Sequence, residues 1–152
     1  MEKELVKRIY TASCALNSLS MAACKNVGLK QNVALLIYIL YNDQPCSQKQ
    51  ICEKWLFPKT TVNTIVKECK NTGLIKFDDI CIIKKERNLV LTEKGEELAR
   101  KLFIDLYEID NIAMRKTIIE YGGKFVEAFE NYVDNYRKLL IEWDKREGSK
   151  NE

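Results

Sequence analysis

The segment from residue 47 to residue 91 constrains the fold of this 152-residue chain more than any other part of the sequence. Ser47, followed three residues later by Gln50, has the pattern of a capping box, which predicts that a helix starts there. Pro58 favours the first turn of a second helix, where its missing N–H is not needed. Gly73 supplies a left-handed stop for that helix. Its buried stripe is predicted at helical spacing to be Val62, Ile65, Val66 and Cys69.

A short β-type segment follows and ends in the run Leu91-Thr92-Glu93-Lys94-Gly95. Two short helices, a tight turn and a hairpin form the order of a winged helix-turn-helix, whose second helix enters the major groove of DNA. The outward face of this second helix carries Lys, Thr and Asn, which can bond phosphates and base edges. An ordinary solvated helix face carries similar side chains, so this face alone does not distinguish a DNA-binding helix from an ordinary surface helix. The predicted DNA contacts are Ser47, Gln48, Lys49, Lys59, Thr60, Thr61, Asn63, Thr64, Lys67, Lys84, Lys85 and Arg87.

Two runs in this region, PCSQKQICEKWLFPKTTVNTIVKECKNTGLI and LVLTEKGEEL, resemble the MarR family of bacterial transcriptional regulators. The resemblance covers about residues 33–98. It implies that residues 58–72 are the recognition helix, that residues 74–91 are the wing, and that the L-T-x-K-G run opens a long helix returning to the dimer interface. Many members carry an Asp-x-Arg pair in the wing, and Ile83 and Lys85 stand at those places here. We therefore expect Lys84, Lys85 and Arg87 to clamp phosphates rather than to read the minor groove.

The rest of the chain indicates helices on both sides of this segment. We expect a mainly α fold of the α+β winged-helix type, with about six helices and a short two- or three-stranded wing. Residues 31–92 would form the DNA-binding part, and residues 1–30 and 93–152 a helical dimerisation part. The last helix repeats apolar residues at steps of four and three, as a coiled-coil seam does. The predicted dimer contacts are Leu5, Ile9, Leu16, Phe125, Phe129, Tyr132, Tyr136, Leu139 and Trp143.

This stripe has a competing interpretation as the core of a monomer, which would need a matching surface within the same chain. The resemblance implies dimerisation through the terminal helices. In a twofold dimer, two recognition helices about 34 Å apart meet successive major grooves of a near-palindromic site. The charge distribution agrees with DNA as a partner: residues 47–94 contain ten Lys/Arg and six Asp/Glu, whereas residues 95–152 carry a net charge of −3.

Several classes of function are disfavoured by what the sequence lacks. The chain has no His and no glycine-rich phosphate loop, so we do not expect an enzyme. We expect neither a metal site nor a cofactor, because the six cysteines show no C-x-x-C spacing. No run of 18 apolar residues and no charged signal region near Met1 occur, so we expect a cytoplasmic protein that does not enter membranes.

The working hypothesis is a homodimeric repressor or activator, with repression favoured, that binds double-stranded DNA at a near-palindromic operator and is modulated by a small-molecule effector, whose site the sequence does not assign. The resemblance implies phenolic or lipophilic effectors for some members. Two alternatives stay open. A winged-helix module can bind protein instead of DNA, because fold does not fix function. A regulator could also sense oxidants through Cys14, although a buried, inert cysteine is the more common case.

Overall fold

The computed structural model describes the backbone of residues 1–83 and 86–148, and the side chains of residues 1–78 and 87–146. The described residues form six helices and three strands, which confirms the mainly α winged-helix class. In chain order they are α1 (Glu2–Asn26), α2 (Gln31–Asp43), β1 (Cys46–Ser47), α3 (Gln48–Trp55), α4 (Lys59–Asn71), β2 (Ile75–Ile83), β3 (Glu86–Leu91), α5 (Glu93–Tyr121) and α6 (Lys124–Gly148).

The chain divides into two compact units, Met1–Asp105 and Leu106–Glu152, and the boundary falls inside α5. The first unit contains the helix-turn-helix, the sheet and the start of α5. The second contains the rest of α5 and all of α6. The division into a part at residues 31–92 and two flanking helical segments stays a prediction.

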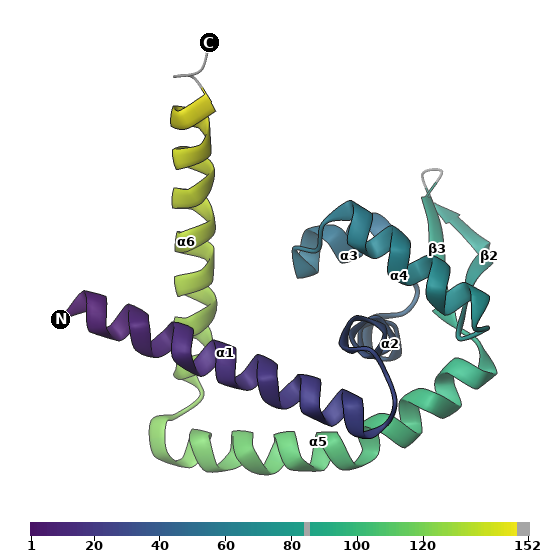
Figure 1. Ribbon diagram of the computed structural model, residues 1–152, viewed down its shortest axis with the longest axis horizontal. Helices are drawn as coiled ribbons and strands as arrows, with labels where there is room; N and C mark the ends of the chain where they lie inside the picture. Colours follow the sequence, from purple (N-terminus) through teal and green to yellow (C-terminus); the bar gives the residue numbers. More distant parts are fainter. Residues whose placement is uncertain (84–85, 149–152) are drawn as a thin grey trace. The chain divides into compact units, whose positions relative to one another are not determined.

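Helix α2 supplies most of the core of the first unit. It is apolar on most of its circumference, which is the pattern of a helix buried on several sides. Figure 1 shows it near the middle of this unit, viewed almost along its axis, with α4 and the hairpin of β2 and β3 around it. Its buried side chains are Val33, Ala34, Leu36, Ile37, Ile39 and Leu40.

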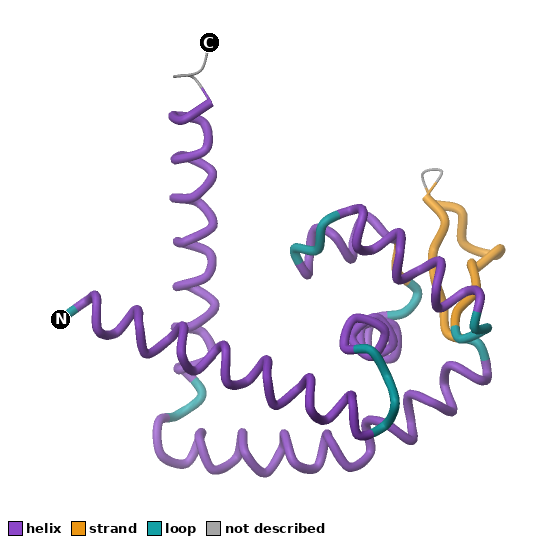
Figure 2. The backbone as a smooth tube through the Cα atoms, viewed as in Figure 1, coloured by secondary structure: helices purple, strands orange, loops and turns teal. Residues whose placement is uncertain are grey.

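The sheet is small and antiparallel, with the strand order β1-β3-β2. Cys46 on β1 lies opposite Leu89 on β3, and Ile75 on β2 lies opposite Leu91. The pairing of β2 with β3 is irregular between Phe77 and Ile82. Figure 2 shows in orange how the hairpin follows α4 after a short turn. This order places the wing directly after the predicted recognition helix.

Candidate nucleic-acid interface

The start of α3 is built as its sequence predicts. The backbone N–H of Gln50 donates to Ser47 Oγ at 3.2 Å, and the backbone N–H of Ser47 donates to Gln50 Oε1 at 2.7 Å. This capping box satisfies two donors that the first turn of a helix leaves without partners. Ser47 is only 3% exposed. Its hydroxyl therefore serves the helix start, and of the predicted contacts on α3 Gln48 and Lys49 are more accessible.

Helix α4 begins at Lys59, directly after Pro58, and presents two different faces. The buried face is Val62, Ile65, Val66 and Cys69, the stripe that the spacing predicts. Gly73 follows the helix with φ of +71°, in the left-handed conformation expected of a helix stop. The outward side chains named as DNA contacts are exposed, except Thr61, which is half-buried: Lys59, Thr60, Thr61, Asn63, Thr64 and Lys67.

An open groove of about 460 Å³ joins three elements of the first unit. Lys49 comes from α3, Lys59 and Asn63 come from α4, and Arg87 comes from β3. Ser47, Gln48, Cys52 and Glu53 complete its lining. Three cations against one acidic residue make this groove electropositive, and an amide side chain lies among them. Six of the predicted DNA contacts are thus brought to one place by the fold.

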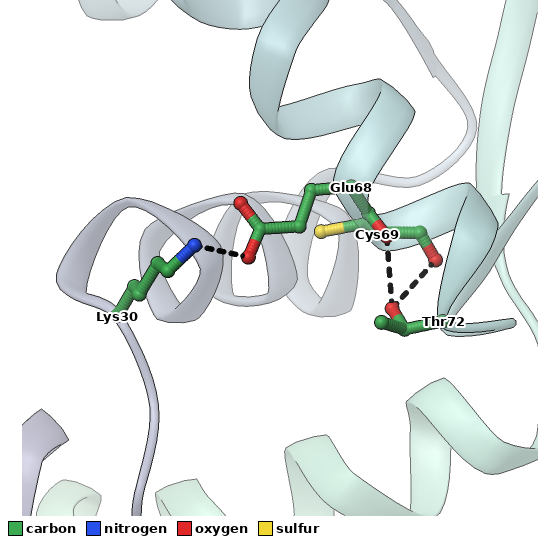
Figure 3. A network of polar contacts seen from close by, with 4 residues as sticks. All are labelled: Lys30, Glu68, Cys69 and Thr72. Carbon is green, nitrogen blue, oxygen red and sulfur yellow. Dashed lines mark hydrogen bonds and ion pairs between the residues drawn. The ribbon is translucent and has the colours of Figure 1, made fainter.

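The three threonines of α4 line a different hollow, of about 520 Å³, beside the end of α1 and the start of α2. The hydroxyl of Thr64 donates to the backbone carbonyl of Thr60 at 2.9 Å, so its oxygen can accept a further bond. Glu68 also lines this hollow, and it is the one acidic residue of α4. Lys30 Nζ lies 2.7 Å from its Oε1 (Figure 3), which offsets its negative charge next to the helix face.

The sequence interpretation missed two residues beside this surface. Lys70 Nζ lies 4.3 Å from the centre of the Phe77 ring, and the guanidinium carbon of Arg87 lies 4.4 Å from the same centre. Lys70 follows Asn63 by seven residues, two helical turns, so helical spacing could have placed it on the same face. No local signal identifies Phe77, because its two partners come from other elements. The predicted contacts Lys84 and Lys85 lie outside the described residues.

The Leu91-to-Gly95 run ties the end of α4 to the start of α5. The hydroxyl of Thr92 donates to the carbonyl of Gly73 at 2.6 Å and accepts from the N–H of Gly95 at 3.1 Å. Lys94 Nζ donates to the carbonyl of Thr72 at 2.8 Å, and the N–H of Thr92 donates to the carbonyl of Leu74 at 3.0 Å. Three successive carbonyls just after α4 therefore accept hydrogen bonds from Thr92 and Lys94, at the start of α5.

The predicted dimer contacts are accessible in the single chain. On α6, Phe129 is 47% exposed and Trp143 is 52% exposed, while Phe125 and Tyr132 are half-buried. Leu5 and Leu16 on α1 are also exposed, and Ile9 is half-buried. Tyr136 and Leu139 are exposed as well. The single chain leaves most of this apolar stripe open to solvent instead of using it as a core.

Three of the described cysteines, Cys24, Cys46 and Cys69, are buried, and Cys14 and Cys52 are more accessible. Burial, with nearby Asp43 as a smaller cause, raises the pKa of Cys46 to about 11, and burial raises the pKa of Cys69 to about 11. Cys14 is exposed and Cys52 is half-buried in the electropositive groove. Within the described residues, no three His, Cys, Asp or Glu side chains gather as metal ligands. No described helix is long and apolar enough to cross a membrane.

Comparison with known proteins shows what this arrangement is similar to. Residues 27–79 match the MarR family model. A MarR family regulator from Neisseria meningitidis has the same fold, with a TM-score of 0.66 and 22% identity over 91% of this chain and 94% of that chain. MarR of Staphylococcus aureus, in complex with salicylate and kanamycin, has a TM-score of 0.66 and 18% identity over 93% of each chain.

A third similar structure contains nucleic acid. It is a MarR family transcriptional regulator from Listeria monocytogenes complexed with 26mer DNA, with a TM-score of 0.63 and 20% identity over 90% of this chain and 89% of that chain. A search of curated proteins finds no match to the sequence. Residues 27–79 are thus similar to the MarR family model, and the chain shares the fold of the MarR family regulator from Neisseria meningitidis over about nine-tenths of its length.

Proposed function

We propose that this protein is a sequence-specific DNA-binding transcriptional regulator that acts as a homodimeric repressor. The observation that carries the proposal is the electropositive groove in which Lys49, Lys59 and Arg87 surround Asn63. Cations on three elements suit the phosphates on both sides of a groove, and an amide suits a base edge. The Listeria monocytogenes relative complexed with DNA supports the same partner for this chain.

Dimerisation is part of the proposed mechanism, because the winged helix-turn-helix of one chain contacts too few base pairs to be selective. The exposed stripe on α6, together with the apolar residues of α1, is proposed as the seam between two copies. Contiguous exposed apolar surface of this kind marks association sites in soluble proteins. Two copies related by a twofold axis would present two α4 helices to a near-palindromic operator.

A small-molecule effector is proposed as the regulatory input, supported by the salicylate complex of the Staphylococcus aureus relative. Such a ligand changes DNA affinity only if it binds one arrangement of the two winged helix-turn-helix units of the dimer more tightly than another. Titrating salicylate against a protein–DNA complex measures this coupling. A DNA affinity that stays constant at saturating salicylate would exclude this compound as the effector.

The proposal is tested first by selecting bound fragments from a random duplex pool with the purified protein. We expect an enriched near-palindromic site whose half-sites are about one helical turn apart. Recovery of a random population would contradict sequence-specific binding. It would favour the alternative of a winged-helix module that binds protein.

Substitutions then separate base reading from phosphate binding. We expect Asn63→Ala to weaken the selected duplex by about ten-fold and a mixed-sequence duplex much less, because a bidentate base contact gives about 1–3 kcal/mol of discrimination. We expect Lys59→Gln to weaken both duplexes equally and to lower the salt slope of binding by about one. Lys101→Gln on α5 is the matched control. Equal losses on both duplexes for Asn63→Ala would remove its role in base reading.

A further inference from the structure

The Phe77 ring contacts one cation of α4 and one cation of β3. It lies on β2, is half-buried, and holds Lys70 Nζ at 4.3 Å and the Arg87 guanidinium carbon at 4.4 Å from its centre. Both distances are within the range of about 6 Å in which an aromatic face attracts a cation. Lys70 belongs to the last turn of α4 and Arg87 to β3. One ring therefore fixes the ends of two long side chains from different elements.

The surroundings of this cluster place it beside the proposed reading surface. Lys70 and Phe77 line a hollow of about 220 Å³ together with Asn63 and Lys67. Arg87 lines the larger electropositive groove, which Asn63 also borders. Asn63 is thus common to both concavities, and the cluster continues the cationic surface from the groove toward the end of α4.

The ring can favour phosphate binding in two ways: it attracts the two positive charges, and it restricts the rotamers of the two side chains before DNA binds. Two cations held close together repel each other, and long side chains lose rotamer freedom when they are fixed. The negative face of an aromatic ring attracts both cations and itself carries no net charge. A phosphate then meets two cations that are already placed.

We propose that Phe77 is a positioning residue for DNA binding: it holds Lys70 and Arg87 as a pair that contacts the phosphate backbone between the recognition helix and the wing. This inference rests on the proposed function, because the phosphate comes from a DNA duplex. It also assigns Lys70 as a DNA contact, which the sequence interpretation did not include.

The main test compares Phe77→Leu with Phe77→Tyr, which keeps the ring. We expect Phe77→Leu to bind the selected duplex and a mixed-sequence duplex about five-fold more weakly, and to lower the salt slope by about one to two as ordered phosphate contacts are lost. Phe77→Tyr should retain the wild-type affinity and slope. The matched control is Tyr41→Leu, which removes another aromatic ring from the first unit, on α2 against Phe103.

A double-mutant cycle separates positioning from simple packing. Arg87→Gln and Lys70→Gln are each measured in the wild-type protein and in the Phe77→Leu background. We expect each substitution to cost less affinity in the Phe77→Leu background, because the ring no longer places the cation. Additive losses, or a wild-type salt slope in Phe77→Leu while Arg87→Gln lowers it, would overturn the proposal.

A measurement on the unmodified protein covers the case in which Phe77→Leu does not fold. Protons above an aromatic face are shifted upfield, so the side-chain NMR signals of Lys70 and Arg87 should lie upfield of those of other lysines and arginines. Unshifted signals would overturn the positioning role even if the protein binds DNA. A protein with shifted signals that binds no duplex would instead contradict the proposed function and, with it, this inference.

Discussion

Burial determines how the individual cysteine residues behave. Cys69 on α4 is fully buried and Cys46 on β1 is nearly so. Transfer of a thiolate from water into an apolar environment is unfavourable, which raises the pKa of both thiols to about 11. These two groups are neutral at physiological pH and are poor nucleophiles there. The exposed Cys14 remains the cysteine on which the oxidant-sensing alternative depends.

The raised pKa values of Cys46 and Cys69 predict a loss of stability at alkaline pH. In the unfolded chain they ionise near their ordinary pKa of 9.0, whereas in the folded protein they ionise only near 11. Between these values the unfolded state binds fewer protons than the folded state. The free energy of unfolding must therefore fall as pH rises from about 9 to about 11.

Urea unfolding at a series of pH values measures this effect. The control is a double variant, Cys46→Ala with Cys69→Ala, which is less stable overall because it leaves small cavities. Its stability should depend less steeply on pH over this window than that of the wild type. An equally steep dependence in the double variant would assign the alkaline loss to other groups.

At the scale of elements, local signals predicted the helices well. The capping box at Ser47 and Gln50 needs residues only three positions apart, and Gly73 stops α4 through its own backbone conformation. Strand β1 was not predicted, because its two residues are defined only by pairing with Leu89 and Asn88 on β3. A two-residue strand has no periodicity of its own, and its partner lies about forty residues along the chain.

The junction of α4, the wing and α5 shows why a glycine stands in the Leu91-to-Gly95 run. A Cβ atom at Gly95 would lie 2.0 Å from the carbonyl oxygen of Leu74, which is backbone and cannot rotate away. We expect Gly95→Ala to lower the free energy of unfolding by about 1–3 kcal/mol, as overpacking in a filled site does. Chemical denaturation measures the change.

The matched control for this substitution is Gly123→Ala, where an added Cβ meets nothing within 4 Å. Its stability should equal that of the wild type or exceed it slightly, because alanine reduces the entropy of the unfolded chain. Equal stability of the two variants would show that the close approach of Gly95 to Leu74 is relieved at no cost.

At the scale of the whole molecule, the proposed dimer explains why so much of the apolar surface of α6 is exposed in one chain. Phe129 and Tyr136 lie two helical turns apart on the stripe, and both are about half exposed. We expect Phe129→Asp with Tyr136→Asp to convert the protein to monomers, because the change buries two charges in the seam. Sedimentation or light scattering measures the mass in solution.

Lys138→Asp, on the other side of α6, is the control and should leave the dimer intact. The monomeric variant should also lose most of its affinity for the selected palindrome while it keeps weak binding to single half-sites. A dimer of unchanged stability in the double variant would show that this face of α6 is not part of the dimer interface. Monomers that bind the operator with full affinity would show that operator binding does not require dimerisation.

The sequence by itself determined the helices, the stop at Gly73, the buried stripe of α4 and the outward face that includes Asn63. These features depend on residues within one or two turns of each other, so spacing and side-chain type are sufficient to predict them. The tertiary structure decided which side chains meet across elements. It brought Arg87 to Lys59, placed Phe77 between the cations of α4 and β3, and forced a glycine next to Leu74. Such contacts join residues far apart in the chain, and their geometry exists only after the core around α2 has packed.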